Sequence, residues 1–169
     1  MDESLDKKID LKDKIKSFFE KNKLKLIIFL FFLLATFLLI FLFNENQKRK
    51  NILLSEKFIK AGLLLSAGDK EKATEYYDEI ILSKNKFYSL LALNTILEKN
   101  LESEKKKILT YFAIIEKIDI TENSLDLIHF KKALYLMDNS EKKNGIEILK
   151  KLIEKNSNLK SIAEEVILE

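Results

Sequence analysis

The stretch Leu26-Ile-Ile-Phe-Leu-Phe-Phe-Leu-Leu-Ala-Thr-Phe-Leu-Leu-Ile-Phe-Leu-Phe43 decides how this chain is organised. It has eighteen consecutive residues without a charge, and sixteen of them are Leu, Ile or Phe. As a helix it would be about 27 Å long, close to the hydrocarbon thickness of a bilayer. On an insertion scale these side chains together favour the membrane by roughly 5 to 10 kcal/mol. We therefore predict a membrane-spanning helix from Leu26 to Phe43.

Two other interpretations of this run fit less well. A buried core helix of this length normally carries a polar stripe, and residues 26–43 carry none. A cleaved signal peptide has a shorter apolar segment that ends at small residues, whereas residues 44–50 contain no such site and include three basic residues. We expect the run to stay in the mature protein as an uncleaved, single-pass signal anchor.

The basic residues around the run predict its orientation. Within twenty residues of it, eight Lys precede the run and five basic residues follow it. The flank richer in Lys and Arg normally stays in the cytoplasm. The sequence thus predicts a charged cytoplasmic segment over 1–25, a transmembrane helix over 26–43 and a domain over 44–169 on the far side of the membrane.

The N-terminal segment 1–25 allows two interpretations. Its apolar residues cover about half of a helical wheel, which fits a short amphipathic helix at the membrane surface. A solvated tail that contains some apolar residues fits equally well. These apolar residues are Leu5, Ile9, Leu11, Ile15, Phe18 and Phe19.

Composition predicts an all-α fold and excludes several functions. The chain has no Pro and only three Gly, so it is poorly suited to hairpins. Without Cys it has no disulfide, thiolate metal site or cysteine nucleophile. Residues 44–169 hold 22 basic and 21 acidic residues, a net charge of +1, which disfavours nucleic-acid binding.

Seven short helices are expected after the anchor, separated by polar breaks. The breaks contain Gly, Asn, Asp, Ser or Thr, which cap helix ends. The fourth and fifth helices are apolar over a wide face and require neighbours on more than one side. The predicted helices are 47–67, 70–82, 87–99, 102–118, 124–137, 141–155 and 159–168.

Small and large residues recur after seventy-two positions, which fits two periods of thirty-six. In each copy a small residue is followed by a turn seven positions later, then a small residue and a large one. The small residues let two helices approach closely, and the large ones fill the groove between helix pairs. The residues predicted to pack the repeats are Ala61, Gly68, Ala73, Tyr77, Ala133, Gly145 and Leu149.

This spacing resembles the tetratricopeptide repeat. The segment Ala61-x6-Gly68-x4-Ala73-x3-Tyr77 fits that pattern well, whereas residues 87–118 fit it poorly and the helix-ending Pro of the consensus is missing. The resemblance implies a tetratricopeptide-like α-solenoid over residues 44–169.

The whole arrangement is similar to the family of the ancillary subunit of the bacterial SecYEG translocon. The shared features are the Lys- and Asp-rich first 25 residues, the single run, the Ala67-Gly68-Asp69 turn and the terminal Ala163-Glu164-Glu165-Val166. The resemblance implies an inner-membrane location with a periplasmic domain over residues 44–169, and contact with the Sec translocon through the membrane segment. It also implies that the outer domain binds periplasmic chaperones or exported chains.

No set of residues predicts catalysis. His129 is the only histidine and stands beside Phe130 on an apolar helix, so we interpret it as a packed or partly exposed residue. Adjacent carboxylates such as Asp78 and Glu79 point apart on a helix, and the Lys pairs and triplets fit solvated helix faces. We expect a protein that is not an enzyme, with no cofactor, no metal and no small-molecule substrate.

The predicted function is protein binding at the membrane. The concave side of the helix stack is the candidate partner groove, and Phe58, Leu65, Phe130 and Met137 would face it. The alternative is that neighbouring helices, or the C-terminal one, cover these residues. A second candidate function is a self-associating envelope scaffold for cell division or envelope assembly.

Overall fold

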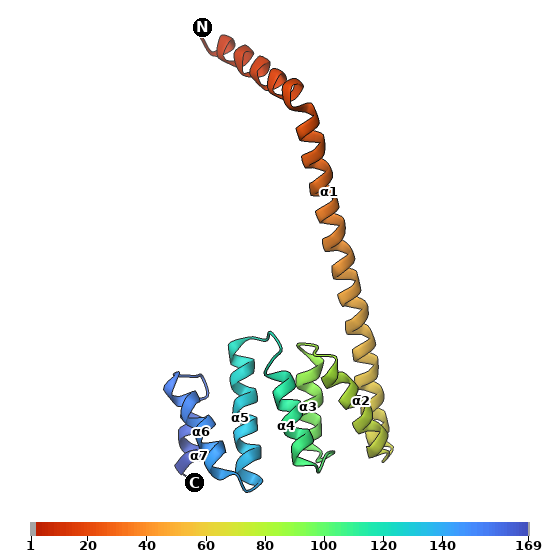
Figure 1. The fold of residues 1–169 in the computed structure, drawn as a ribbon, viewed down its shortest axis with the longest axis vertical. Coiled ribbons are helices and arrows are strands. Elements are labelled where there is room, and N and C mark those ends of the chain that lie inside the picture. Colours follow the sequence, from red (N-terminus) through yellow and green to blue (C-terminus); the bar gives the residue numbers. More distant parts are fainter. Residues whose placement is uncertain (1–2, 169) are drawn as a thin grey trace. The chain divides into compact units, whose positions relative to one another are not determined.

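The chain is helical throughout the part that the computed structural model describes, residues 3–168, with side chains described from Lys14 onward (Figure 1). This confirms the predicted all-α class. The helices are α1 (Glu3–Ser66), α2 (Lys70–Leu82), α3 (Tyr88–Glu98), α4 (Lys105–Ile115), α5 (Glu122–Asp138), α6 (Lys142–Glu154) and α7 (Lys160–Leu168).

The contacts within the chain form two groups, one up to Lys50 and one from Asn51 onward. The first group contains the apolar run, whose best 18-residue window has a mean hydropathy of 3.2 and no buried residue. In the described residues, α1 is the one helix long and apolar enough to cross a membrane. Its backbone is helical from Glu3 on, as the first of the two interpretations of residues 1–25 requires.

The break expected between residues 43 and 47 does not exist, because α1 continues through it to Ser66. The predicted separate helix over 47–67 is therefore wrong in its start. Residues 44–50 contain neither Gly nor Pro and consist of Asn, Glu, Gln, Lys and Arg, most of which are good helix formers. Arg49 Nε also lies 3.7 Å from Glu45 Oε1, an i, i+4 pair that suits a helix.

The other helices begin and end near the predicted residues, with α4 differing most. It starts at Lys105 instead of 102, because Glu104 is extended and its N–H donates to the Glu102 carboxylate at 2.8 Å. It ends at Ile115 instead of 118, where the chain tightens and the Ile118 N–H donates to the Ile115 carbonyl. A shorter α4 leaves residues 101–104 without regular structure.

Most helices end at a residue in the left-handed conformation. Gly68 closes α1 with a φ of 88°, and the Asp69 N–H reaches back to the Leu64 carbonyl at 3.0 Å. Such closures satisfy carbonyls that the last turn of a helix leaves unpaired. With few glycines available, the chain uses other residue types elsewhere, namely Lys84, Asn100, Ser140 and Asn156.

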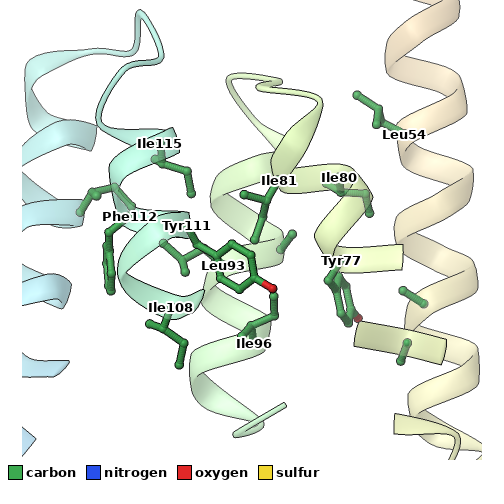
Figure 2. Packing of buried hydrophobic residues seen from close by; sticks show 14 residues of the cluster. Leu54, Tyr77, Ile80, Ile81, Leu93, Ile96, Ile108, Tyr111, Phe112 and Ile115 are labelled. Carbon is green, nitrogen blue, oxygen red and sulfur yellow. The ribbon is translucent and has the colours of Figure 1, made fainter. Parts of the chain in front are cut away.

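The group from Asn51 onward has two apolar clusters that share α5. The first cluster, drawn in Figure 2, joins the end of α1 to α2, α3, α4 and Ile128 of α5. The second cluster joins α5 to α6 and α7. Its fully buried members are Ala133, Leu149, Leu152 and Ala163. Each cluster is built mainly from helices that follow one another in the chain.

Positions seventy-two residues apart have the same environment. Ala61 and Ala133 are both fully buried, and Gly68 and Ser140 both have a positive φ. Tyr77 and its counterpart Leu149 are also buried. The compared positions thus share their burial or their backbone conformation.

Gly145 permits the close approach of α5 and α6. A Cβ at this position would lie 2.4 Å from Met137 Cγ and 2.6 Å from the Ala133 backbone oxygen. Both distances are far below van der Waals contact, and the second one involves backbone that cannot rotate away. A side chain at 145 would therefore force the two helices apart.

Asp126 fastens the start of α5 to the linker between α6 and α7. Its side chain is 5% exposed and accepts hydrogen bonds from Lys155 and Ser157. Burial alone would raise the pKa of Asp126, but the hydrogen bonds from Lys155 and Ser157 outweigh burial and hold that pKa below its usual value. The ionised carboxylate is thus the form that stabilises the fold.

We predict that Gly145→Ala lowers the free energy of unfolding by about 1 to 3 kcal/mol, the usual effect of overpacking. Gly62→Ala is the matched control, because Gly62 is also helical and its Cβ would meet only Tyr77 Oη, at 4.0 Å. That control should raise stability by up to about 1 kcal/mol through helix propensity. All five Tyr lie after Asn51, so tyrosine fluorescence during urea unfolding in detergent reports on this part alone. Equal effects of the two changes would contradict the close approach.

We predict that Asp126→Asn lowers stability near neutral pH and that its difference from the wild type shrinks below about pH 4. The folded pKa of Asp126 is depressed, so its contribution is complete above the unfolded pKa and is lost as the pH falls through the folded pKa. The neutral-pH loss should be about 1 to 3 kcal/mol. Asp119→Asn, at an exposed ion pair with Lys86, is the control and should change stability little. A pH-independent difference for Asp126→Asn would contradict the assignment.

Candidate protein-binding surface

The four residues predicted to face a partner groove are all half-buried. Phe58 and Leu65 of α1 pack against the first apolar cluster. Phe130 and Met137 of α5 pack against the second cluster, and Met137 lies over Gly145. Neighbouring helices therefore cover much of each side chain. Partner binding by the exposed part of these four side chains stays a prediction.

Phe58 is held by two aromatic neighbours. Its ring centroid lies 5.5 Å from that of Tyr77 in α2 and 6.3 Å from that of Tyr88 at the start of α3. The pair with Tyr77 is edge-to-face and the pair with Tyr88 is tilted, and an edge-to-face pair at such a distance adds to the stabilisation that burial gives. The repeat residue Tyr77 and the groove residue Phe58 thus belong to one packed aromatic group that joins three helices.

The structure contains a cleft that the sequence did not predict. It has a volume of about 560 Å³ and is lined by residues of α3, the α3–α4 linker, α4, α5 and the turn after α5. We call it the α3–α5 cleft. Its lining residues are Ile96, Leu97, Glu98, Asn100, Glu102, Ser103, Ile108, Lys131, Leu134, Tyr135, Asp138 and Asn139.

Apolar and charged side chains share the walls of the α3–α5 cleft. Leu134 and Tyr135 are half-buried and present apolar surface from α5. Three acidic residues and one Lys line the cleft, so its side chains carry a formal charge of −2. Such a lining suits a partner segment that carries both apolar and basic side chains.

A signal for this cleft exists in the sequence but is weak. Residues 131, 134, 135 and 138 recur at helical spacing and form one face of α5. That face mixes charged and apolar residues, so it resembles an ordinary solvated edge. The cleft is also lined by Glu102 and Ser103, which lie before α4 where a longer helix was expected.

A polar cluster around Lys107 ties α4 to α2 and to the α3–α4 linker. Lys107 Nζ lies 2.8 Å from Asp78 Oδ2 and 3.0 Å from Glu102 Oε2. The hydrogen bond with Asp78 raises the pKa of Lys107, and burial raises the pKa of the neighbouring Tyr111 hydroxyl. Lys107 therefore stays charged and the Tyr111 hydroxyl stays protonated near neutral pH, so the cluster is suited to a structural tie.

His129 lies beside Glu116 and carries no sign of a ligand role. Its Nε2 is 3.8 Å from Glu116 Oε1, while Lys132 Nζ approaches the same oxygen at 2.8 Å. Burial lowers the pKa of His129, which keeps the imidazole neutral near pH 7. Among the residues from 14 to 168, no group of three His, Cys, Asp or Glu side chains could hold a metal ion.

No family model, no curated protein and no solved structure matches the chain. The functional interpretation therefore depends on the residues and contacts of the chain itself.

We predict that Phe58→Ala lowers the free energy of unfolding by about 2 to 4 kcal/mol, near the range for buried aromatic residues. The loss should arise because Phe58 packs on Tyr77, Tyr88 and the first cluster. Ile59→Ala is the matched control, since the next residue is 59% exposed and should tolerate truncation. If Phe58→Ala left urea unfolding unchanged, the side chain would belong to an open groove instead.

Proposed function

We propose that this chain is a membrane-anchored protein-interaction module of the bacterial inner membrane. Residues 1–25 lie in the cytoplasm, residues 26–43 span the bilayer, and residues 44–169 hold protein partners on the periplasmic side. The single observation that carries the proposal is a fully apolar, unburied helix in the same chain as a small helical domain with a partner-sized cleft. The module needs no cofactor for this role.

The solvent exposure of the apolar side chains in residues 26–43 supports the proposed membrane anchor. Its large side chains are exposed in the described structure, for example Phe31 at 72% and Phe32 at 70%. Leaving such residues in water is unfavourable by about 1.5 to 3 kcal/mol each. A lipid environment removes that cost for all of them at once. The excess of Lys before the run supports a cytoplasmic N-terminus.

A tetratricopeptide-like solenoid is supported by the pattern of helix contacts. The most extensive contacts join consecutive helices: α2 with α3, α5 with α6, and α6 with α7. The shared environments of residues 61–80 and 133–152 fit two copies of one repeat. Such stacks present a continuous surface on which extended or helical segments of partners can dock.

The proposed place of action is beside the Sec protein-export channel. This part of the proposal follows from the resemblance to the ancillary translocon subunit family, and the partners would be the channel, periplasmic chaperones or emerging chains. The mechanism would be tethering, because fixing a weak binding site at the membrane raises its effective concentration near its partner. An acidic, partly apolar cleft fits segments of unfolded chains that mix basic and apolar residues.

A self-associating scaffold is the second candidate. One observation favours it: Ile52, Ile59 and Leu63 form an apolar stripe along α1, and each is 59 to 66% exposed. Their spacing of seven and four residues places them on one helix face, as in helix–helix interfaces. Two copies could pair along this stripe and leave the α3–α5 cleft free.

Site-specific photocrosslinking of the full chain in its membrane tests the proposal. A photoreactive residue in place of Leu134 lines the α3–α5 cleft, and one in place of the exposed Lys150 on α6 is the matched control. We expect position 134 to yield adducts with channel subunits, chaperones or exported chains and position 150 to yield few. Adducts at position 134 that contain only a second copy of this chain, or yields equal at the two positions, would contradict the proposal.

A further inference from the structure

One loop of the group from Asn51 onward carries exposed apolar and basic side chains. Residues 83–87 join α2 to α3, and we call them, together with Leu82 at the end of α2, the α2–α3 loop. Leu82 at one end is 61% exposed and Phe87 at the other is 62% exposed. Lys84 and Lys86 stand between them, and the loop contains no acidic residue. Large apolar residues flanked by Lys are typical of protein segments that lie at a lipid surface.

Asn85 holds this loop in place. Its Nδ2 donates to Asn51 Oδ1 on α1 at 2.7 Å, and its Oδ1 accepts from the Phe87 and Tyr88 backbone N–H groups at 3.0 Å each. Both the amide nitrogen and the amide oxygen of the Asn85 side chain are thus hydrogen-bonded. The loop is pinned beside Asn51, and Phe87 stays exposed although the backbone around it is hydrogen-bonded.

The chain between the apolar run and Asn51 is short. Eight residue steps separate Phe43 from Asn51, so their Cα atoms lie at most about 28 Å apart in any conformation and about 12 Å apart in a helix. The headgroup layer extends about 5 to 8 Å beyond the hydrocarbon. A run that spans the bilayer therefore keeps Asn51, and the loop pinned to it, within about 28 Å of the hydrocarbon edge in any conformation and within about 12 Å of it where residues 43–51 are helical.

We propose that the α2–α3 loop binds the surface of the bilayer in which α1 is anchored. Phe87 and Leu82 enter the headgroup region, and Lys84 lies against anionic lipid phosphates. Lys86 is already paired with Asp119 at 2.6 Å, which leaves Lys84 as the main basic contact. The inference rests on the proposed anchoring of residues 26–43 and goes beyond the protein-binding role.

Such a contact would give the helical domain a second attachment to the membrane. The first attachment is the polypeptide itself through residues 44–50. Two attachments restrict tilting of the domain and fix its height above the lipid surface. The α3–α5 cleft would then meet partners at a defined distance from the bilayer.

A fluorescent probe at the loop tests this inference in the full chain. The chain has no Cys, so a single Lys86→Cys change allows labelling with an environment-sensitive fluorophore while Phe87 and Lys84 remain. A second labelled variant, Lys99→Cys, is the matched control, because Lys99 is exposed at the other end of α3. A third, Phe37→Cys, reports on the apolar run. Each is reconstituted in vesicles of equal parts phosphatidylcholine and phosphatidylglycerol with a headgroup spin-label quencher.

We expect blue-shifted emission and quenching at position 86 and water-like, unquenched emission at position 99. Adding Phe87→Ser and Lys84→Glu should remove the shift at position 86 without changing tyrosine fluorescence, which reports on folding. In vesicles of phosphatidylcholine alone, the blue shift at position 86 should be smaller. Water-like emission at position 86 together with a lipid-like signal at position 37 would overturn the loop contact and leave the anchor intact. A water-like signal at position 37 would overturn both.

Discussion

The unfavourable exposure of an apolar helix to water is the constraint on which the organisation of this chain depends. Residues 26–43 contain no charge, and their best window has no buried residue in the described structure. The domain after Asn51 completes its own apolar clusters without them. No described part of the protein buries the best window of this run, and under the proposed anchoring a bilayer would cover the whole run.

Close packing of consecutive helices is the second constraint, and small residues make it possible. Ala61 and Ala133 are fully buried, and Gly145 lies where any side chain would collide with α5. Polar ties then fasten the linkers, as Asp126 does through Lys155 and Ser157. The domain is thus held together mostly by contacts between neighbours along the chain, as expected of a short helical array.

Much of this fold could be predicted from the residues. The α2 bounds follow from Gly68, which ends α1 in a left-handed conformation, and from Asp69, whose carboxylate caps α2. The continuity of α1 was missed because the transmembrane helix was expected to end at Phe43 and a new helix to start at Gln47, although none of residues 44–46 is Gly or Pro. The local sequence identifies helix caps well. A polar stretch without Gly or Pro, however, can either end a helix or form one more turn of it.

The candidate binding surface was harder to predict, because it depends on distances between helices. Small residues at 133 and 145 signal that α5 and α6 are close, and both are buried as expected. The α3–α5 cleft is instead lined partly by Glu102 and Ser103, which lie in the irregular stretch before α4, where the Glu104 N–H donates to the Glu102 carboxylate. A hydrogen bond between two residues of a linker leaves no periodic pattern in a sequence.

Extraction of membranes from cells that make the full chain tests the central claim most directly. After an alkaline carbonate wash, which removes peripheral proteins, the account predicts that the chain stays in the membrane pellet and needs detergent for release. Recovery of the intact chain in the soluble fraction, monodisperse on size-exclusion chromatography without detergent, would contradict it. That result would mean that residues 26–43 find their cover in protein and not in lipid.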